Sequence, residues 1–167
     1  MGGTLVTEDM RRMIGTEAPP YTVEVEKGDL RRFLAATGDT NPLFCDEEWA
    51  KTHRYGGVIL PPTLFCPDPI IASYIAGLER PIPFKYRIDG GTEWECVRPV
   101  KIGDVLTIIT KVADLYEKQG GPQTGRMLFT IIEATCRNQR NELVGIARST
   151  HICYEGPSNS TQEAPGR

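Results

Sequence analysis

The 167-residue sequence lacks features that several classes of protein require. No apolar run approaches the length of a membrane span, and its start lacks the basic region and apolar stretch of a secretory signal. The formal net charge of −3 gives no basic excess for binding nucleic acid. The chain has only two histidines, and its five cysteines are scattered without a Cys-x-x-Cys pair, which disfavours zinc and a disulfide framework. We therefore expect a cytoplasmic protein without a metal or cofactor.

Size and composition favour one globular domain. Hydrophobic residues make up 40% of the chain and charged residues 25%, as in an ordinary folded protein, and the length permits a substantial core. We expect this domain over residues 1–155. Residues 156–167 offer no apolar anchor, which predicts a disordered C-terminal tail.

The first half of the chain carries mainly helical patterns. Residues Tyr21–Glu26 alternate with a period of two and predict a first or edge strand. An amphipathic turn is predicted over Leu30–Thr37, with Asp29 as its N-cap and Gly38 at its end. A short helix is predicted over Asp46–Lys51, because its charges suit the helix dipole.

The longest apolar segment runs over Thr63–Leu78. Its apolar residues recur at mostly helical spacings, which predicts a buried helix. Pro67 and Pro69 interrupt or delay this helix, so that it becomes regular after Asp68.

The second half of the chain reads as strands after Gly90 and Gly91. Four runs are rich in Val, Ile, Thr and aromatic residues. Turn-rich connections separate the last three runs and predict antiparallel hairpins. The whole pattern predicts an α+β domain with one central helix and strands at Glu93–Val97, Val105–Tyr116, Met127–Arg137 and Leu143–Tyr154.

A short loop carries the main chemical signal. The stretch from Gly38 to Phe44 resembles the Gly-Asp-x-Asn-Pro-x-His signature of MaoC-like enoyl-thioester hydratases and dehydratases. In that family the Asp and the His hold and activate the water that adds across the double bond. Asp39 occupies the Asp position, but Phe44 replaces the His. A phenylalanine has no proton to transfer, so this side chain cannot act as a general acid or base.

Three segments in the same order extend the resemblance over most of the chain. They are similar to the N-terminal, or FAS1-like dehydratase, branch of the MaoC-like family. The resemblance implies a hotdog fold, in which an antiparallel sheet wraps around a central helix and two hotdogs pair with a thioester tunnel between them. Many members of this branch carry Tyr or Phe at the His position and resemble the substrate-binding partner in heterodimers. The three segments are Arg32–Leu43, Tyr55–Thr63 and Arg98–Asp104.

The candidate catalytic residues each have a structural alternative. Asp39 either positions water or caps the turn that it forms with Asn41, because Asx side chains bond to nearby amides. Asn41 either orients water or a thioester carbonyl, or serves as turn chemistry before proline. Phe44 either lines the acyl tunnel or packs in the core.

Four further residues are candidates for substrate binding. Pro62 and Thr63 belong to the second matching segment. Gly90 and Gly91 either provide a bend before a strand or bring their amides close to the thioester carbonyl as an oxyanion site.

The two histidines lie outside the signature. His53 has polar neighbours, so a surface position is favoured. His151 lies in a predicted strand, where a structural role is favoured.

Two functional hypotheses follow. The first is a hydratase or dehydratase family protein that acts on an acyl-CoA or acyl-carrier-protein thioester. It is either the substrate-binding subunit, paired with a MaoC-like catalytic partner, or a self-sufficient homodimer that uses Asp39. The second is a non-catalytic module that binds acyl thioesters.

Overall fold

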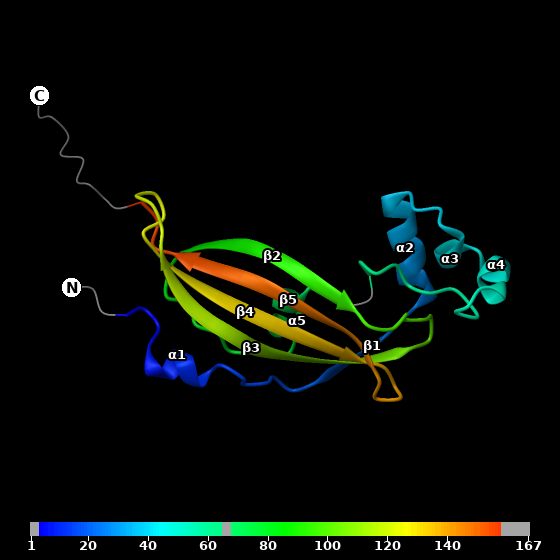
Figure 1. Cartoon of the computed structure of the whole chain (residues 1–167), viewed down its shortest axis with the longest axis horizontal. Coiled ribbons are helices and arrows are strands. Elements are labelled where there is room, and N and C mark those ends of the chain that lie inside the picture. The colour runs from blue at the N-terminus through cyan, green and yellow to red at the C-terminus, as the bar shows by residue number, and fades with distance from the viewer. Residues whose placement is uncertain (1–3, 65–67, 158–167) are drawn as a thin grey trace, which may run out of the picture.

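The computed structural model describes residues 4–64 and 68–157. Five strands form one antiparallel sheet in the order β1-β3-β4-β5-β2 (Figure 1). The predicted α+β class is confirmed. In chain order the elements are α1 (Glu8–Arg12), β1 (Tyr21–Glu24), α2 (Lys27–Thr37), α3 (Pro42–Cys45), α4 (Glu47–Thr52), α5 (Pro69–Ile75), β2 (Tyr86–Cys96), β3 (Val105–Gln119), β4 (Arg126–Arg137) and β5 (Leu143–Tyr154).

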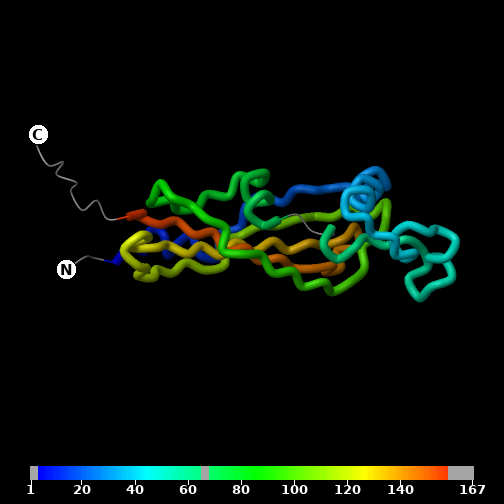
Figure 2. The backbone as a smooth tube through the Cα atoms, turned by 90° about the horizontal axis from the view of Figure 1, so that it is seen from above, coloured from blue at the N-terminus to red at the C-terminus, as the bar shows by residue number. Residues whose placement is uncertain are grey.

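The three longest strands form the body of the sheet. β3 pairs with β4 and β4 with β5, both antiparallel, so the predicted hairpins are confirmed. Buried positions alternate along these strands because successive side chains point to opposite faces. The buried face includes Ile108, Leu128 and Ile132, which are completely shielded from solvent. Helix α5 packs against this face of β3, β4 and β5 (Figure 2).

Helix α5 is shorter and less buried than the sequence pattern predicts. It begins at Pro69, directly after Asp68, where the sequence predicts that the helix becomes regular, but it ends at Ile75 and not at Leu78. Proline lacks an amide hydrogen and is tolerated in the first turn of a helix, so Pro69 suits the start that is observed. Pro67 lies outside the described residues. Ala72 and Ser73 are fully buried, but Ile71, Tyr74 and Ile75 are largely exposed.

Asp68 fastens the start of α5 to the sheet. Its Oδ1 accepts the amide hydrogens of Ile70 at 2.8 Å and Ile71 at 3.3 Å, as an N-cap does. Its Oδ2 accepts hydrogen bonds from the hydroxyls of Thr92 at 3.0 Å and Ser149 at 3.1 Å. One carboxylate therefore holds the helix terminus against both β2 and β5.

Strand β2 begins earlier than predicted and forms one edge of the sheet. It starts at Tyr86, so Gly90 and Gly91 lie inside the strand and do not precede it. The pairing with β5 shifts register between Asp89 and Thr92, which places both glycines at an irregularity. A Cβ on Gly90 would lie 2.8 Å from the Thr150 methyl carbon, so the close approach of β5 requires glycine here.

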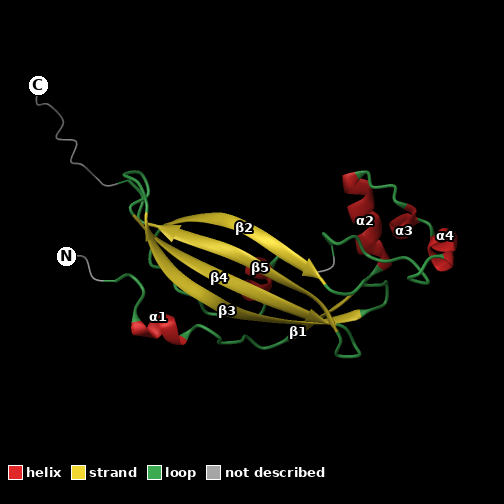
Figure 3. Cartoon of the chain, viewed as in Figure 1, coloured by secondary structure: helices red, strands yellow, loops and turns green. Residues whose placement is uncertain are grey.

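Helices α2, α3 and α4 gather at one end of the sheet, away from α1 (Figure 3). Helix α2 begins at Lys27, one turn before the predicted start, and Glu26 occupies its N-cap position without a side-chain cap. The prediction of Asp29 as N-cap is wrong, because Asp29 lies in the first turn and pairs with Arg32. Gly38 ends the helix in a left-handed conformation, with φ of 67°, as predicted.

Two further expectations concern the C-terminal tail and membrane-spanning helices. The predicted tail lies, from residue 158 onward, outside the described residues. Before that point Gly156 still donates a hydrogen bond to the Thr124 carbonyl at 3.1 Å. Within residues 4–64 and 68–157, no helix has the length and apolar character needed to cross a membrane.

We expect Asp68→Ala to lower the free energy of unfolding by about 2–4 kcal/mol, because it removes a helix cap and two hydrogen bonds to buried or half-buried hydroxyls. Urea unfolding followed by circular dichroism measures this loss. Asp46→Ala is the matched control: Asp46 caps α4 through a single bond to the Trp49 amide at 2.9 Å, and its loss should cost about 1 kcal/mol. Equal losses in the two variants would show that the bonds from Asp68 to the sheet add no stability.

Candidate functional site

The signature loop is held together by its own polar side chains. Asp39 Oδ1 accepts the amide hydrogen of Asn41 at 2.9 Å, and Asn41 Oδ1 accepts that of Leu43 at 3.1 Å. Asn41 is thereby the N-cap of α3, with Pro42 in the first turn. Both side chains therefore make the turn contacts that formed the structural alternative to a catalytic role.

Phe44 lies half-buried in the short helix α3. Its amide donates to the Asn41 carbonyl at 2.9 Å, and the preceding residue, Leu43, accepts a backbone hydrogen bond from Ile59 at 3.3 Å. The loop is thus tied to the segment that leads toward α5. At the position where the signature has its acid/base histidine, the loop presents an apolar ring.

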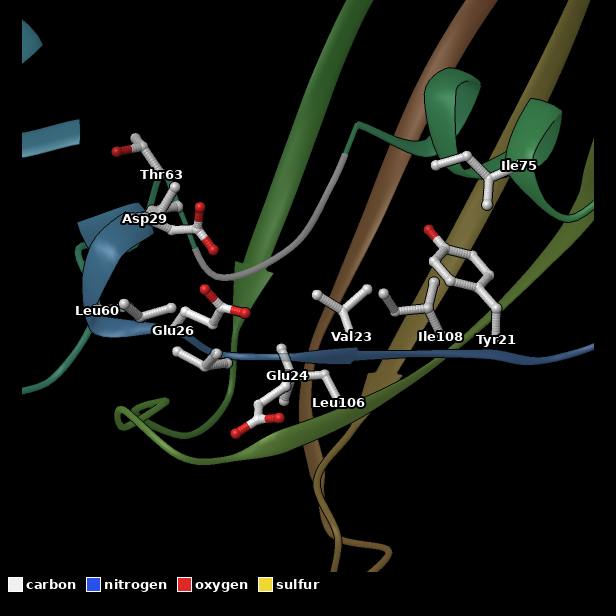
Figure 4. Close-up of a pocket in the computed structure, with 12 residues that line it drawn as sticks. Tyr21, Val23, Glu24, Glu26, Asp29, Leu60, Thr63, Ile75, Leu106 and Ile108 are labelled. Atoms are coloured by element: carbon white, nitrogen blue, oxygen red, sulfur yellow. The ribbon is translucent and has the colours of Figure 1, made fainter. Parts of the chain in front are cut away.

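A mainly apolar cavity of about 380 Å³ lies between β1, β3, the start of α2 and the segment before α5 (Figure 4). Its volume lies within the range of small-molecule sites, and its lining is mainly apolar. The lining residues are Tyr21, Val23, Glu24, Val25, Glu26, Asp29, Leu60, Thr63, Leu64, Ile75, Leu106 and Ile108.

The late start of α5 places irregular chain beside this cavity. Leu60, Thr63 and Leu64 line it from the segment before the helix, and Ile75 lines it from the last turn of α5. On the sheet side, Tyr21 pairs in register with Ile108, and Val23 pairs with Leu106. The cavity therefore lies beside the short edge strand β1, where a sheet edge meets a shortened helix.

The structure brings only one of the predicted site residues to this cavity. Thr63 lines it, whereas its described lining does not include Asp39, Asn41 or Phe44. Pro62 lines a different hollow together with Cys96, whose Sγ lies 3.8 Å from the Pro62 carbonyl oxygen.

Gly90 and Gly91 are also separate from the cavity lining. The Gly91 amide donates to the Asp89 carboxylate at 2.8 Å, so this amide already has an acceptor. The predicted role of these glycines in an oxyanion site stays a prediction, and their observed contacts are those of a tight strand irregularity.

Four of the cavity residues that the sequence interpretation missed come from two strands. Tyr21 and Val23 alternate in β1, and Leu106 and Ile108 alternate in β3. This period of two identified the faces of the strands, but it did not show that the two faces would meet beside an interrupted helix.

The histidines differ in environment. His53 stacks on Trp49 with ring centroids 3.7 Å apart, on exposed positions around α4. His151 is buried on the α5 side of the sheet, with Nδ1 3.8 Å from Cys153 Sγ. Burial lowers the pKa of His151, and nearby Arg80 and Arg87 lower it further while Asp89 opposes them. His151 is therefore uncharged at neutral pH.

The described residues contain no cluster of three or more His, Cys, Asp or Glu side chains that would suit a metal ion. Several of their carboxylates are engaged in helix caps and ion pairs. An example is Glu133, which bonds to Lys111 at 2.8 Å and Arg148 at 2.7 Å across neighbouring strands.

Comparison with known proteins identifies the family of this chain. Residues 12–147 match the family described as "FAS1-like, dehydratase domain region". A UPF0336 protein of Saccharopolyspora erythraea is 31% identical over 146 residues, which cover 83% of this chain and 87% of that protein.

Solved structures share the fold at lower identity. The MaoC-like dehydratase of Rhodospirillum rubrum has a TM-score of 0.63 and 22% identity, and the match covers 94% of this chain and 100% of that chain. A chain of the C-terminally truncated HadBC (3R-hydroxyacyl-ACP dehydratase) complex of Mycobacterium tuberculosis has a TM-score of 0.66 and 21% identity, and covers 84% and 96% of the two chains. These similarities, together with the sheet wrapped around α5, confirm the predicted hotdog fold. The chain belongs to the family of the FAS1-like dehydratase domain region, and it shares its fold with MaoC-like dehydratases.

Proposed function

We propose that this chain is the substrate-binding subunit of a heteromeric acyl-thioester hydratase or dehydratase. In this proposal it holds the acyl group, and a second hotdog chain with an intact Asp and His carries out the chemistry. The observation that carries the proposal is Phe44, which stands at the acid/base position of an otherwise matching signature loop.

The reaction explains why this substitution matters. Hydration of a trans-2-enoyl thioester adds a hydroxyl group to C3 and a proton to C2, and dehydration reverses both steps. One group must take a proton from water and one must deliver a proton to carbon. Phe44 can do neither, and Asp39 Oδ1 already accepts the Asn41 amide hydrogen. The partner is therefore assigned both proton transfers.

The apolar cavity supports a binding role. Leu60, Leu106 and Ile108 are buried at its wall, and an acyl chain that enters it leaves water for an apolar surface. Such transfer is favourable by roughly 25 cal/mol per Å² of apolar area. This chain thus offers a place for the part of the substrate that does not react.

The edge strand β2 supports a partner subunit. Within the described residues β2 pairs with β5 alone, so its outer edge carries unpaired backbone groups. Tyr86, Ile88, Trp94 and Val97 are exposed on or next to this strand. Exposed edges with large apolar side chains mark sites of association. The HadBC structure is itself named as a complex, which agrees with a second subunit.

We expect the purified chain alone to hydrate enoyl-CoA at a rate at least about 100-fold below that of its complex with a MaoC-like chain that carries Gly-Asp-x-Asn-Pro-x-His, since acid/base groups contribute about 10²–10⁴ in rate. Loss of enoyl-thioester absorbance measures this rate with short, medium and bulky acyl groups. Full activity of the chain alone, abolished by Asp39→Ala, would instead identify a self-sufficient homodimeric hydratase. Acyl-CoA binding without turnover in any mixture would identify a non-catalytic binding module.

The variant Phe44→His should raise the hydration rate of the isolated chain above that of the unaltered protein, because it places an imidazole in the same loop as Asp39. Phe44→Leu is the matched control, since it changes the ring without adding a titratable group. The same absorbance assay gives both rates. If Phe44→His folds like the unaltered chain and gains no activity, more than the histidine has been lost from this site.

Ile88→Lys should weaken assembly with the partner chain at least about tenfold without unfolding the chain, because Ile88 is 55% exposed on the edge strand. Light scattering coupled to size-exclusion chromatography measures the assembly. Ile14→Lys is the matched control: Ile14 is 40% exposed and bridges to Val112 at the other side of the sheet. Unchanged assembly of Ile88→Lys would place the partner elsewhere.

A further inference from the structure

The two ends of the apolar cavity differ in chemistry. Figure 4 shows Glu26, Asp29 and Thr63 together at the end beside α2, whereas Tyr21 and Ile75 lie together at the end beside α5. The apolar side chains of Val23, Leu106 and Ile108 lie between these ends. The cavity therefore has a polar end, an apolar middle and an end wall made by two large side chains.

The charges around the cavity disfavour an anionic ligand inside it. Three carboxylates, Glu24, Glu26 and Asp29, belong to the lining, and none of its described residues is Lys, Arg or His. A further negative charge in this cavity would lose hydration without gaining a cationic partner among the lining residues. The acyl group that fits is uncharged along its whole length.

The end wall is held in place by the sheet. Tyr21 lies on β1, and its backbone pairs in register with that of Ile108 on β3. Its side chain is half-buried and packs against the core cluster that includes Leu106 and Ile108. Its hydroxyl points toward Ile75 of α5 in Figure 4. A ring anchored in this way on one strand can limit how far a chain extends along the cavity.

We propose that Tyr21, together with Ile75, sets the length of an uncharged acyl group held in this cavity. The inference rests on the proposed function, because it assumes that the chain binds acyl thioesters. At about 380 Å³ the cavity is near the lower end of the usual range for ligand sites, so it takes an acyl group and leaves the coenzyme outside.

Acyl-CoA binding to the full chain, alone and in complex with its partner, tests the length limit. Isothermal titration with butanoyl-, octanoyl-, dodecanoyl- and hexadecanoyl-CoA should show affinity that rises by about fourfold per buried methylene and then stops rising. Tyr21→Ala should move this limit to longer chains, so that at least one longer acyl-CoA gains about tenfold or more in affinity. Tyr21→Phe keeps the ring and should keep the limit.

Two further variants separate the end wall from general damage. Tyr116→Ala removes a half-buried tyrosine of β3 that stacks on Phe129, outside the cavity, and should leave the limit unchanged. Ile75→Ala acts at the same end wall from a side chain that is 62% exposed, so it should extend the limit with little cost in stability. It serves as the test if Tyr21→Ala does not fold.

The outcomes distinguish this inference from the proposed function. If the unaltered chain binds acyl-CoA and neither end-wall variant shifts the length limit, the role of Tyr21 is overturned while substrate binding stands. If no acyl-CoA binds to the chain alone or in the complex, both proposals fall. If octanoyl-CoA and its analogue with a terminal carboxylate bind equally well, the requirement for an uncharged acyl group is overturned.

Discussion

The arrangement of this protein depends on the anchoring of a short helix at Asp68. A single carboxylate caps α5 and bonds to hydroxyls on β2 and β5, so the helix is fixed against the sheet at its first turn. Leu60, Thr63 and Leu64 precede α5 in a segment without helix or strand, and they line the apolar cavity together with residues of β1. The apolar cavity lies between this segment and β1. The cap thus fixes the start of the helix whose last turn contributes Ile75 to the cavity lining.

The chain separates features that a self-sufficient hydratase would combine. Its signature loop uses Asp39 and Asn41 to cap a turn, and Phe44 supplies no proton-transfer group. Its apolar cavity is lined by other residues, and its long edge strand β2 remains open within the described residues. This combination is what the proposed substrate-binding subunit requires.

Much of the fold could be predicted because the strands carry strong local signals. β3, β4 and β5 alternate buried and half-buried positions, and turn residues separate them, so their hairpins follow from the pattern. β2 was predicted too short, because an edge strand exposed on both faces has no clear alternation and contains Gly90 and Gly91. The prolines indicate that α5 becomes regular only after Asp68, as observed, but apolar spacing does not show that the helix ends at Ile75.

For the candidate site, the amino-acid sequence alone determined the family, the capping chemistry of the loop and the missing histidine, since each depends on residues close together along the chain. It could not determine the cavity. Tyr21, Leu60 and Ile108 are far apart in sequence. They come to line one cavity only when β1 pairs with β3 and the segment that contains Leu60 packs beside these strands. The open edge of β2 was likewise decided by tertiary structure, because which strand lies at the edge depends on long-range pairing and not on local propensity.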